Sequence, residues 1–339
     1  MLFPATFRYA DGPAPNIAAL AFTLLGYPLG VALLTAHSWS LNALGFGLVT
    51  LTLIWSAYYI HEFAHQAIFK DAAANDSWGT LMSWINGSCF ARFAAMRRKH
   101  MRHHVERADV ITFDARGFIE KSPAWFQATV VALEWAYFPA VEFLMRGFVM
   151  AKPFMMKDPL PVRLRIIAIA IVRLAGFAAL GAYSPKALLL YFIAYLLFIT
   201  VLRFADCFQH TYDSYPILGD APIPDDKVRD RAYEQANTYT NVVALESFWL
   251  NLLWLNFGYH NAHHERPTVP WHRLPAYHHE IYGDTYAQVV PVRTLLRAFH
   301  DHRVKRVLSD DYGTVLEPTA PRRADGFVGA VGVSFLTAV

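Results

Sequence analysis

Residues 17–36 read IAALAFTLLGYPLGVALLTA, a run without a single charged side chain. At a rise of about 1.5 Å per residue, roughly 20 apolar residues cross the hydrocarbon core of a bilayer as a helix. A second uncharged run, residues 41–60, follows after the short polar link HSWS. The two runs predict a hairpin of membrane-spanning helices.

Two later runs, residues 164–183 and 187–202, predict a second hairpin, with Arg173 as a lone charge in the middle of the first run. The composition agrees with a membrane protein, because 55% of the residues are hydrophobic and the mean hydropathy is +0.24. Each hairpin returns the chain to the side from which it started. The segments after the hairpins, residues 61–163 and 203–312, are therefore expected to share one face.

We accordingly expect an all-α integral membrane protein with four spans in two hairpins. Residues 1–312 would form a single domain whose helical cap faces the cytosol, and residues 313–339, rich in Gly, Ala and Pro, would be a loosely ordered tail. Residues 124–150 contain charges and a central proline, which predicts a kinked interfacial or cap helix rather than a span. Residues 240–258 predict another helix packed against the cap.

Basic residues cluster in the segment after the first hairpin: Arg97, Arg98, Lys99, Arg102 and Arg107. The positive-inside rule makes that face cytoplasmic, so we expect a multi-pass protein of a bacterial inner membrane. The start of the chain does not have the pattern of a secretory signal, so the spans themselves would direct insertion.

A net charge of +3 without a long basic run argues against a nucleic-acid partner. Cys89 and Cys207 have no C-x-x-C spacing, which excludes an iron–sulfur centre built from this chain.

The fifteen histidines fall largely into three clusters, HEFAH at 61–65, HMRHH at 100–104 and HNAHH at 260–264. Offsets of three and four residues return to the same face of a helix, so each cluster can direct two or three imidazoles at one point. A lone HxxxH pair arises often by chance. The H-x-x-H-H spacing occurs twice, however, and all three clusters are expected on one side of the membrane, which predicts a metal site.

The identity of the metal depends on the number of ligands. HEFAH fits a zinc peptidase, in which Glu62 would be the general base, but such a site has no use for six more clustered histidines. Two metal ions with about four nitrogen ligands each explain the set better, and iron suits oxidation of an unactivated hydrocarbon. A metal transporter would need polar residues within the spans, which carry little besides Arg173.

The three clusters in this order resemble the histidine boxes of the integral-membrane fatty acid desaturase and hydroxylase superfamily. The segment HERPTVPWHRLP (264–275) and FQHTYD (208–213) are similar to further features of that superfamily, and the resemblance extends over roughly residues 15–285. It implies two non-haem irons that activate O2 as co-substrate. Carried over position by position, it implies nine iron ligands: His61, His65, His100, His103, His104, His210, His260, His263 and His264.

The resemblance implies an oxidoreductase, with fatty acyl desaturation as the first expectation. Hydroxylation or ketolation of a fatty acid, an alkane or a carotenoid, and oxidative decarboxylation of a fatty acid to a terminal alkene, remain open alternatives. An intramembrane zinc peptidase remains the alternative from another class. Because the chain contains no electron carrier of its own, a separate ferredoxin or b-type cytochrome with its reductase is expected, with the basic cluster as its docking patch or as a headgroup anchor.

Several residues near the boxes are candidates for supporting roles. Glu62 could receive an imidazole N–H and fix its tautomer, and Asp109 and Asp206 could do the same or could be ordinary polar residues. Asn261 and Glu265, which flank box ligands, are similarly ambiguous. His272, His278 and His279 lack helical spacing to a partner and are expected to be cap histidines.

Overall fold

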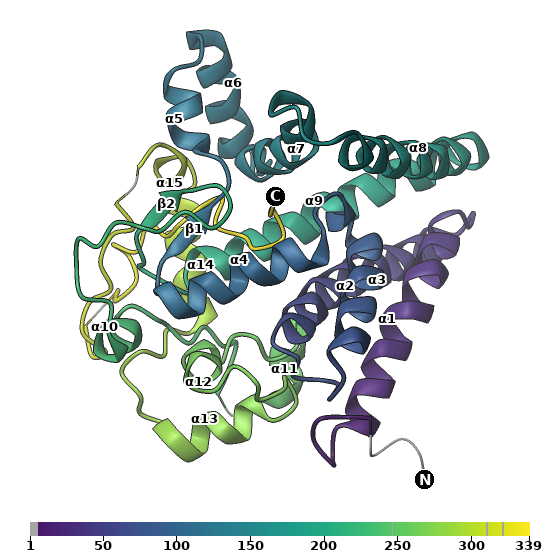
Figure 1. The fold of residues 1–339 in the computed structure, drawn as a ribbon. Helices are drawn as coiled ribbons and strands as arrows, with labels where there is room; N and C mark the ends of the chain where they lie inside the picture. The colour runs from purple at the N-terminus through teal and green to yellow at the C-terminus, as the bar shows by residue number, and fades with distance from the viewer. Residues whose placement is uncertain (1–5, 246, 310, 321) are drawn as a thin grey trace. The chain divides into compact units, whose positions relative to one another are not determined.

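The computed structural model describes residues 6–245, 247–309, 311–320 and 322–339, and these are predominantly helical (Figure 1). The chain divides into two compact units. The first unit contains Met1–Ala94 and Arg146–Val201, and the second contains Ala95–Met145 and Leu202–Val339.

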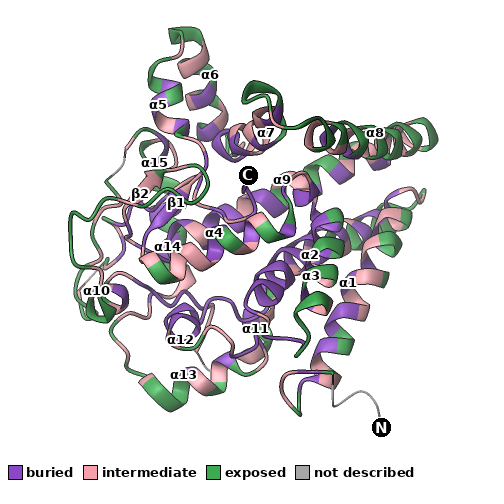
Figure 2. Ribbon diagram, in the orientation of Figure 1, coloured by how far each residue is buried: buried purple, intermediate pink, exposed green. Residues whose placement is uncertain are grey.

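The first unit contains the four helices that are long and apolar enough to cross a membrane: α1 (Pro13–Leu34), α2 (Trp39–Ala64), α8 (Leu160–Tyr183) and α9 (Pro185–Cys207), of which α9 continues into the second unit. These helices confirm the four spans expected from the sequence. Each begins about two to four residues earlier than its apolar run, because flanking polar and proline residues continue the helix beyond the apolar core. Figure 2 shows that α8 is mostly exposed, as expected for a helix that faces lipid.

The first hairpin is tightly packed because small residues face each other where α1 and α2 meet. A Cβ atom added to Gly45 would lie 2.7 Å from the carbonyl oxygen of Gly30, so a larger residue would force the helices apart. Asn42 ties the turn together by donating to the carbonyl oxygens of Leu33 and Leu34 at 2.9 and 3.1 Å. Close backbone approach and a satisfied polar side chain together fix this hairpin.

Polar contacts join the second hairpin to the first within this unit. The hydroxyl groups of Tyr27 and Tyr191 lie 2.9 Å apart, and Lys186 donates to the side-chain oxygen of Asn42 at 2.8 Å. Arg173, the charged residue in the middle of α8, donates to the carbonyl oxygen of Trp84 at 3.0 Å, near the end of α3 (Ala72–Asn86). Its guanidinium group therefore reaches a backbone acceptor instead of remaining among apolar side chains.

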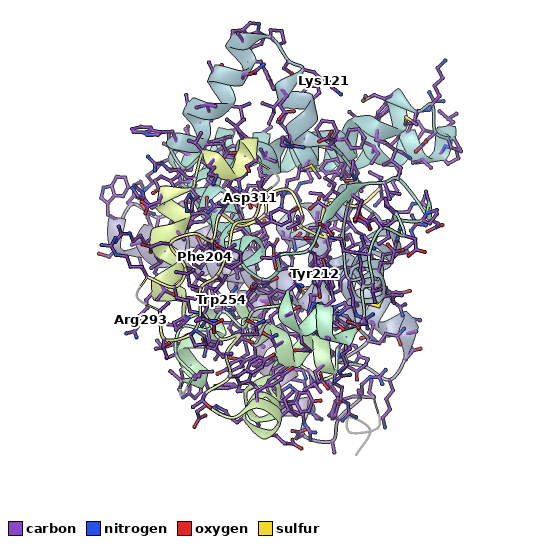
Figure 3. All side chains as sticks on the ribbon, turned by 90° about the vertical axis from the view of Figure 1, so that its left-hand side faces the viewer. Lys121, Phe204, Tyr212, Trp254, Arg293 and Asp311 are labelled. Carbon is purple, nitrogen blue, oxygen red and sulfur yellow. The ribbon has the colours of Figure 1, made fainter. Side chains whose placement is uncertain are left out.

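The second unit is built from short helices and a two-stranded parallel sheet in which β1 (Asp109–Ile111) pairs with β2 (Ser214–Pro216). The sheet matters for the site because it holds Asp109, just beyond the second histidine cluster, beside the segment that follows His210. Figure 3 shows Tyr212 among the packed side chains and Lys121 at the outer end of α5. The helices of this unit, including two that share residues with the first unit, are α4 (Phe93–Glu106), α5 (Ala115–Glu120), α6 (Ala124–Trp135), α7 (Ala140–Met155), α10 (Arg231–Ala236), α11 (Phe248–Asn251), η2 (Leu252–Trp254), α12 (His260–Glu265), α13 (Leu274–Tyr282), α14 (Val292–Asp301) and α15 (Lys305–Leu308).

Residues 124–150 form two helices, α6 and α7, instead of one kinked helix. The chain leaves the helical conformation at Tyr137, whose φ is +63°, and Pro139 precedes the start of α7. Glu134 and Glu142, on either side of this break, turn inward and bind Arg203. The acidic side chains that make this stretch unsuited to lipid are thus buried in the second unit.

The expectation of one helix over residues 240–258 is wrong for the described residues. Helical structure is confined to α11 and η2, and Leu255 and Asn256 have positive φ angles of +49° and +57°. Asn251 is the physical reason, since its side chain binds the backbone at Val243 and Ala244 and closes a loop. Residue 246, which belongs to the same expectation, lies outside the described residues.

The segment at the end of the chain belongs to the second unit. Residues 313–339 contain no helix where they are described, yet many of their side chains are buried, including those of Phe327 and Leu336. The backbone N–H of Ala330 donates to the carbonyl oxygen of Cys207 at 2.9 Å. Small residues allow this irregular segment to pack closely within the second unit.

Candidate metal centre

The first histidine cluster lies at the end of a predicted span. Helix α2 continues without a break through His61 and ends with His65 as its C-cap residue. The two rings meet edge to face, with centroids 4.8 Å apart, and both side chains are buried. The offset of four residues thus brings the two imidazoles together on one face, as the spacing predicts.

The other two clusters are held by short helices of the second unit. Helix α4 carries His100, His103 and His104, and α12 carries His260, His263 and His264. His210 follows α9 and forms an isolated antiparallel bridge with Thr238. Asn261 fixes α12 to the same neighbourhood, because its side-chain amide donates to the carbonyl oxygen of Thr238 at 2.8 Å.

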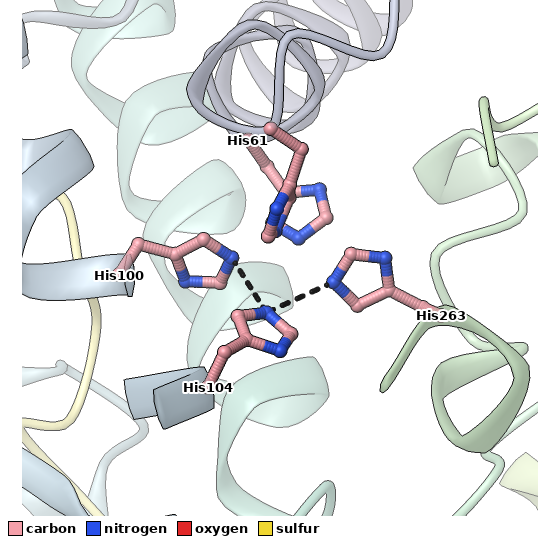
Figure 4. Close-up of side chains that lie close together, drawn as sticks. His61, His100, His104 and His263 are labelled. Atoms are coloured by element: carbon pink, nitrogen blue, oxygen red, sulfur yellow. Dashed lines mark hydrogen bonds between the residues drawn. The ribbon is translucent and has the colours of Figure 1, made fainter. Parts of the chain in front are cut away.

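Three of these histidines form one group, which we call the three-histidine group: His100, His104 and His263. Nε2 of His104 lies 3.2 Å from Nε2 of His100 and 3.2 Å from Nε2 of His263. Figure 4 draws His104 between the other two rings, with these contacts as dashed lines. The three rings come from two helices and direct one nitrogen each at a common point.

The remaining four form a second group, which we call the four-histidine group: His103, His210, His260 and His264. Their ligand nitrogens all lie within 4.8 Å of one another. Nε2 of His210 is 3.0 Å from Nε2 of His103 and 2.7 Å from Nε2 of His260. His210, the single histidine outside the three boxes that the sequence singled out, therefore belongs to this group.

Oxygen atoms on the outer side of the rings fix their orientation. Nδ1 of His103 donates to Asp109 at 2.9 Å, and Nδ1 of His264 donates to Glu234 at 2.9 Å. The hydroxyl oxygen of Thr238, whose hydrogen is directed at the carbonyl oxygen of Glu234, lies 3.2 Å from Nδ1 of His210. In each of these three rings the proton is therefore on Nδ1, and the lone pair is on Nε2.

This arrangement of lone pairs fits a metal ion. Nε2 of His103 and Nε2 of His210 face each other at 3.0 Å without a proton between them, which is repulsive unless a cation lies there. Nitrogens bound at about 2.1 Å and at right angles or tetrahedrally around one ion would be roughly 3.0–3.4 Å apart. Nε2 of His264 is buried and has no hydrogen-bond partner among the described residues, which leaves it available as a ligand.

Burial keeps the imidazoles in the state that binds metal. It is the main cause that lowers the pKa of His100, His210 and His260 well below the ordinary value, and neighbouring imidazoles act in the same direction. Burial also lowers the pKa of His264 to about 4, although Glu234 opposes the shift. At neutral pH these rings are neutral, with a lone pair ready for an ion.

Comparison with known proteins identifies the family. The family model described as fatty acid desaturase matches residues 17–295, which is well over half of the chain. The chain belongs to the fatty acid desaturase family. No curated protein and no solved structure gives a significant match. With its four spans and its histidine groups, this member of the desaturase family is an integral membrane oxidoreductase.

Glu234 and Thr238 are supporting residues of this family member that sequence reasoning missed. Both lie in or just after α10, far from the boxes along the chain, and no spacing rule links them to His264 or His210. Glu234 also accepts from Nε of Arg107 at 2.8 Å. Burial alone would raise the pKa of Glu234, but the bonds from His264 and Arg107 bring it below its ordinary value.

Replacement Glu234→Gln is expected to weaken metal binding by about 10–100-fold, the usual effect of losing a partner that orients a ligand. The amide cannot accept from His264 and Arg107 as strongly as the carboxylate does. Metal titration of the purified protein measures the change. Glu280→Gln, an exposed substitution on α13, is the matched control and should leave affinity unchanged. Equal affinities for the two variants would contradict the role assigned to Glu234.

The other candidates from the sequence have different positions. Asp109 binds His103, as one of its two expected roles required, whereas Glu265 binds Arg231 and does not contact the histidine groups through a described hydrogen bond. Oε1 of Glu62 is 3.5 Å from Nδ1 of His61, which is long for a hydrogen bond. The three later histidines lie in or beside α13: His272, His278 and His279.

Three members of the basic cluster, Lys99, Arg102 and Arg107, have internal partners, whereas Arg98 is exposed. Arg102 binds Glu106 and the carbonyl oxygens of Gly219 and Ala221, and Arg107 binds Glu234. Lys99 is buried. These three cations bind acceptors within the second unit and so help to hold it together. The sequence alone could not show these contacts.

A small cavity of about 50 Å³ lies beside the four-histidine group. Its lining includes three members of that group. Asp206, a candidate supporting residue from the sequence, also lines this cavity. A cavity of this size has room for a few water molecules or for O2, but not for an acyl chain. The cavity could therefore admit only small molecules to the centre. It is lined by Lys99, His100, His103, Asp109, Val110, Asp206, Gln209, His210, Phe257, His260, Val333, Ser334 and Phe335.

Proposed function

We propose that the protein is a membrane-bound, non-haem di-iron enzyme that uses O2 to desaturate a fatty acyl chain. The observation that carries the proposal is the pair of facing Nε2 lone pairs on His103 and His210, each fixed by an outer oxygen partner. Membership of the desaturase family supports lipid oxidation as the reaction class.

The proposed ligand sets follow the two groups. The four-histidine group would hold one iron and the three-histidine group the other, and the family resemblance adds His61 and His65, at the end of α2, to the proposed ligands. Imidazole suits iron in this role, and four or five nitrogens around each ion leave positions open for small molecules. All nine histidines carried over from the family resemblance are thereby used.

When bound, the two irons would supply the activation of O2 and the abstraction of hydrogen. The residues of this chain hold the imidazoles in one tautomer through Asp109, Glu234 and Thr238 and keep the site buried. The overall reaction removes two hydrogens from neighbouring carbons of the chain. O2, two electrons and two protons together with these hydrogens give two water molecules.

The electrons would come from a separate one-electron carrier. A ferredoxin or a small b-type cytochrome with its reductase fits, because the two cysteines of the chain cannot hold a cluster. The basic residues after the first hairpin favour a cytoplasmic position for the histidines, and a bacterial inner membrane would provide both the lipid and the donor. An exposed cation such as Arg98 would steer an acidic donor more readily than the buried Lys99.

The experiment that tests the proposal is expression of the protein with a ferredoxin and its reductase, followed by profiling of lipids and pigments. New double bonds in fatty acids are the expected result. New hydroxyl or keto groups, or alkenes shorter by one carbon, would replace desaturation by hydroxylation, ketolation or decarboxylation on the same centre. Purified protein should contain about two irons per chain, as in other two-metal sites. One zinc per chain would instead support a peptidase and overturn the proposal.

A further inference from the structure

The segment 324–339 reaches the cavity beside the four-histidine group. Val333, Ser334 and Phe335 are consecutive residues of its lining, opposite His100, His103, His210 and His260. The approach to the cavity is held by two bonds within the second unit: the N–H of Gly332 donates to Glu142 at 3.1 Å, and Nε of Arg306 donates to the carbonyl oxygen of Val328 at 2.7 Å. A part of the chain that carries no histidine therefore contributes a wall of the centre.

Lys99 holds this wall from the opposite side. Its buried ammonium group donates to the carbonyl oxygen of Ser334 at 2.8 Å and lies 3.4 Å from the carbonyl oxygen of Thr337. The hydroxyl of Thr112 donates to the same Thr337 carbonyl at 2.8 Å. A charged donor to backbone oxygens is a strong bond, and Lys99 precedes His100 directly on α4.

Phe335 brings an apolar ring to the histidines. Its centroid lies 5.0 Å from that of His100, and its backbone is anchored on both sides by the bonds to Ser334 and Thr337. An aromatic ring in this position covers His100 and limits the cavity to about 50 Å³. Removing it would leave space that water can fill, because the lining includes polar groups that would hold it.

We infer that residues 333–337 are the closing wall of the metal centre, with Lys99 as the positioning residue that holds Phe335 against His100. This inference rests on the proposed function and adds to it a residue that controls access of water and small molecules. Lys99 acts through the wall, by its bonds to the backbone oxygens of Ser334 and Thr337. Because these bonds are made to the backbone on both sides of Phe335, Lys99 sets the position of the Phe335 ring.

The wall matters for the fate of O2. In the proposed reaction, O2 takes two electrons and two protons from outside and two hydrogens from the chain. If water reaches the centre, O2 can instead take only the two external electrons and two protons and leave as H2O2, with no change in the lipid. A closed wall thus favours oxidation of the chain over release of peroxide.

The test uses the iron-loaded, full-length protein in detergent and compares Lys99→Met and Phe335→Ala with wild type. The first measurement is the rate at which an excess of a water-soluble chelator removes iron. Loss of one charge-assisted bond or of the covering ring should increase that rate by about tenfold. The second measurement is the yield of H2O2 per O2 consumed with the electron donor, which should rise in both variants. Lys99→Arg keeps the donors and Phe335→Leu keeps apolar bulk, so both should restore most of the protection.

Lys121→Met and Phe118→Ala are the matched controls, because both side chains are exposed on or at the end of α5. They should behave as wild type in both measurements. Unchanged chelation rates and peroxide yields in Lys99→Met and Phe335→Ala would overturn the inference, as would equal increases in the controls. Absence of iron from the wild-type protein would instead overturn the proposed function. If Phe335→Ala does not fold, the comparison of Lys99→Met with Lys99→Arg decides the inference alone.

Discussion

Replacement His264→Ala is expected to abolish oxidation and to lower the iron content from about two to about one per chain. The ring supplies a lone pair on Nε2 to the four-histidine group, and Glu234 fixes its tautomer from outside. Losing a ligand should reduce activity by more than about a hundredfold, the upper end for partners that only orient ligands. Iron analysis and product yield from the same preparation measure both effects.

His279→Ala is the control for this variant. His279 is exposed on α13, and its Nδ1 lies 2.7 Å from Asp284. Replacing His279 therefore tests the loss of a histidine that is not a proposed ligand. It should retain both iron and activity. An unchanged iron content in His264→Ala, or equal losses in the two variants, would show that the four-histidine group does not hold a metal.

The spans and the three boxes could be predicted because both depend on local patterns. A bilayer sets the length of an uncharged helix, and the pitch of a helix sets the offsets at which imidazoles meet. His210 followed from the resemblance to the desaturase superfamily and not from spacing, since it stands alone after α9. Family membership confirms the class, and the structure places His210 in the four-histidine group.

The residues that orient the histidines and hold the wall of the centre could not be predicted, because their contacts are formed between segments far apart in sequence. Glu234 reaches His264, 30 residues away, and Arg107, 127 residues away. Lys99 reaches Ser334 across 235 residues. From the sequence alone, Lys99 and Arg107 were two more members of a basic run, and the burial that commits them to internal acceptors depends on the tertiary fold. The same holds for the irregular segment 313–339, whose small residues gave no periodic signal.

Arg203, Glu134 and Glu142 form a buried ion cluster in the second unit. Arg203 lies between Glu134, to which it forms a close salt bridge, and Glu142, whose carboxylate is 3.4 Å from Nε of Arg203. Glu134 also accepts from the N–H of Val141 at 3.0 Å, and Glu142 from the N–H of Gly332 at 3.1 Å. The cluster therefore joins α6, α7, α9 and the segment that leads to Phe335.

Replacement Arg203→Met is expected to lower the free energy of unfolding by about 3–5 kcal/mol, because it leaves two carboxylates buried without their cation. Unfolding of the purified protein in detergent measures the change. Arg297→Met, which removes an exposed partner of Asp301, should change the free energy of unfolding by less than about 1 kcal/mol. Adding Glu134→Gln to Arg203→Met should recover part of the loss, since one of the unpaired charges is then removed. If Arg203→Met lowers the free energy of unfolding no more than Arg297→Met does, water or another cation must reach these carboxylates. The ion cluster would then not hold the segment that leads to Phe335 in place.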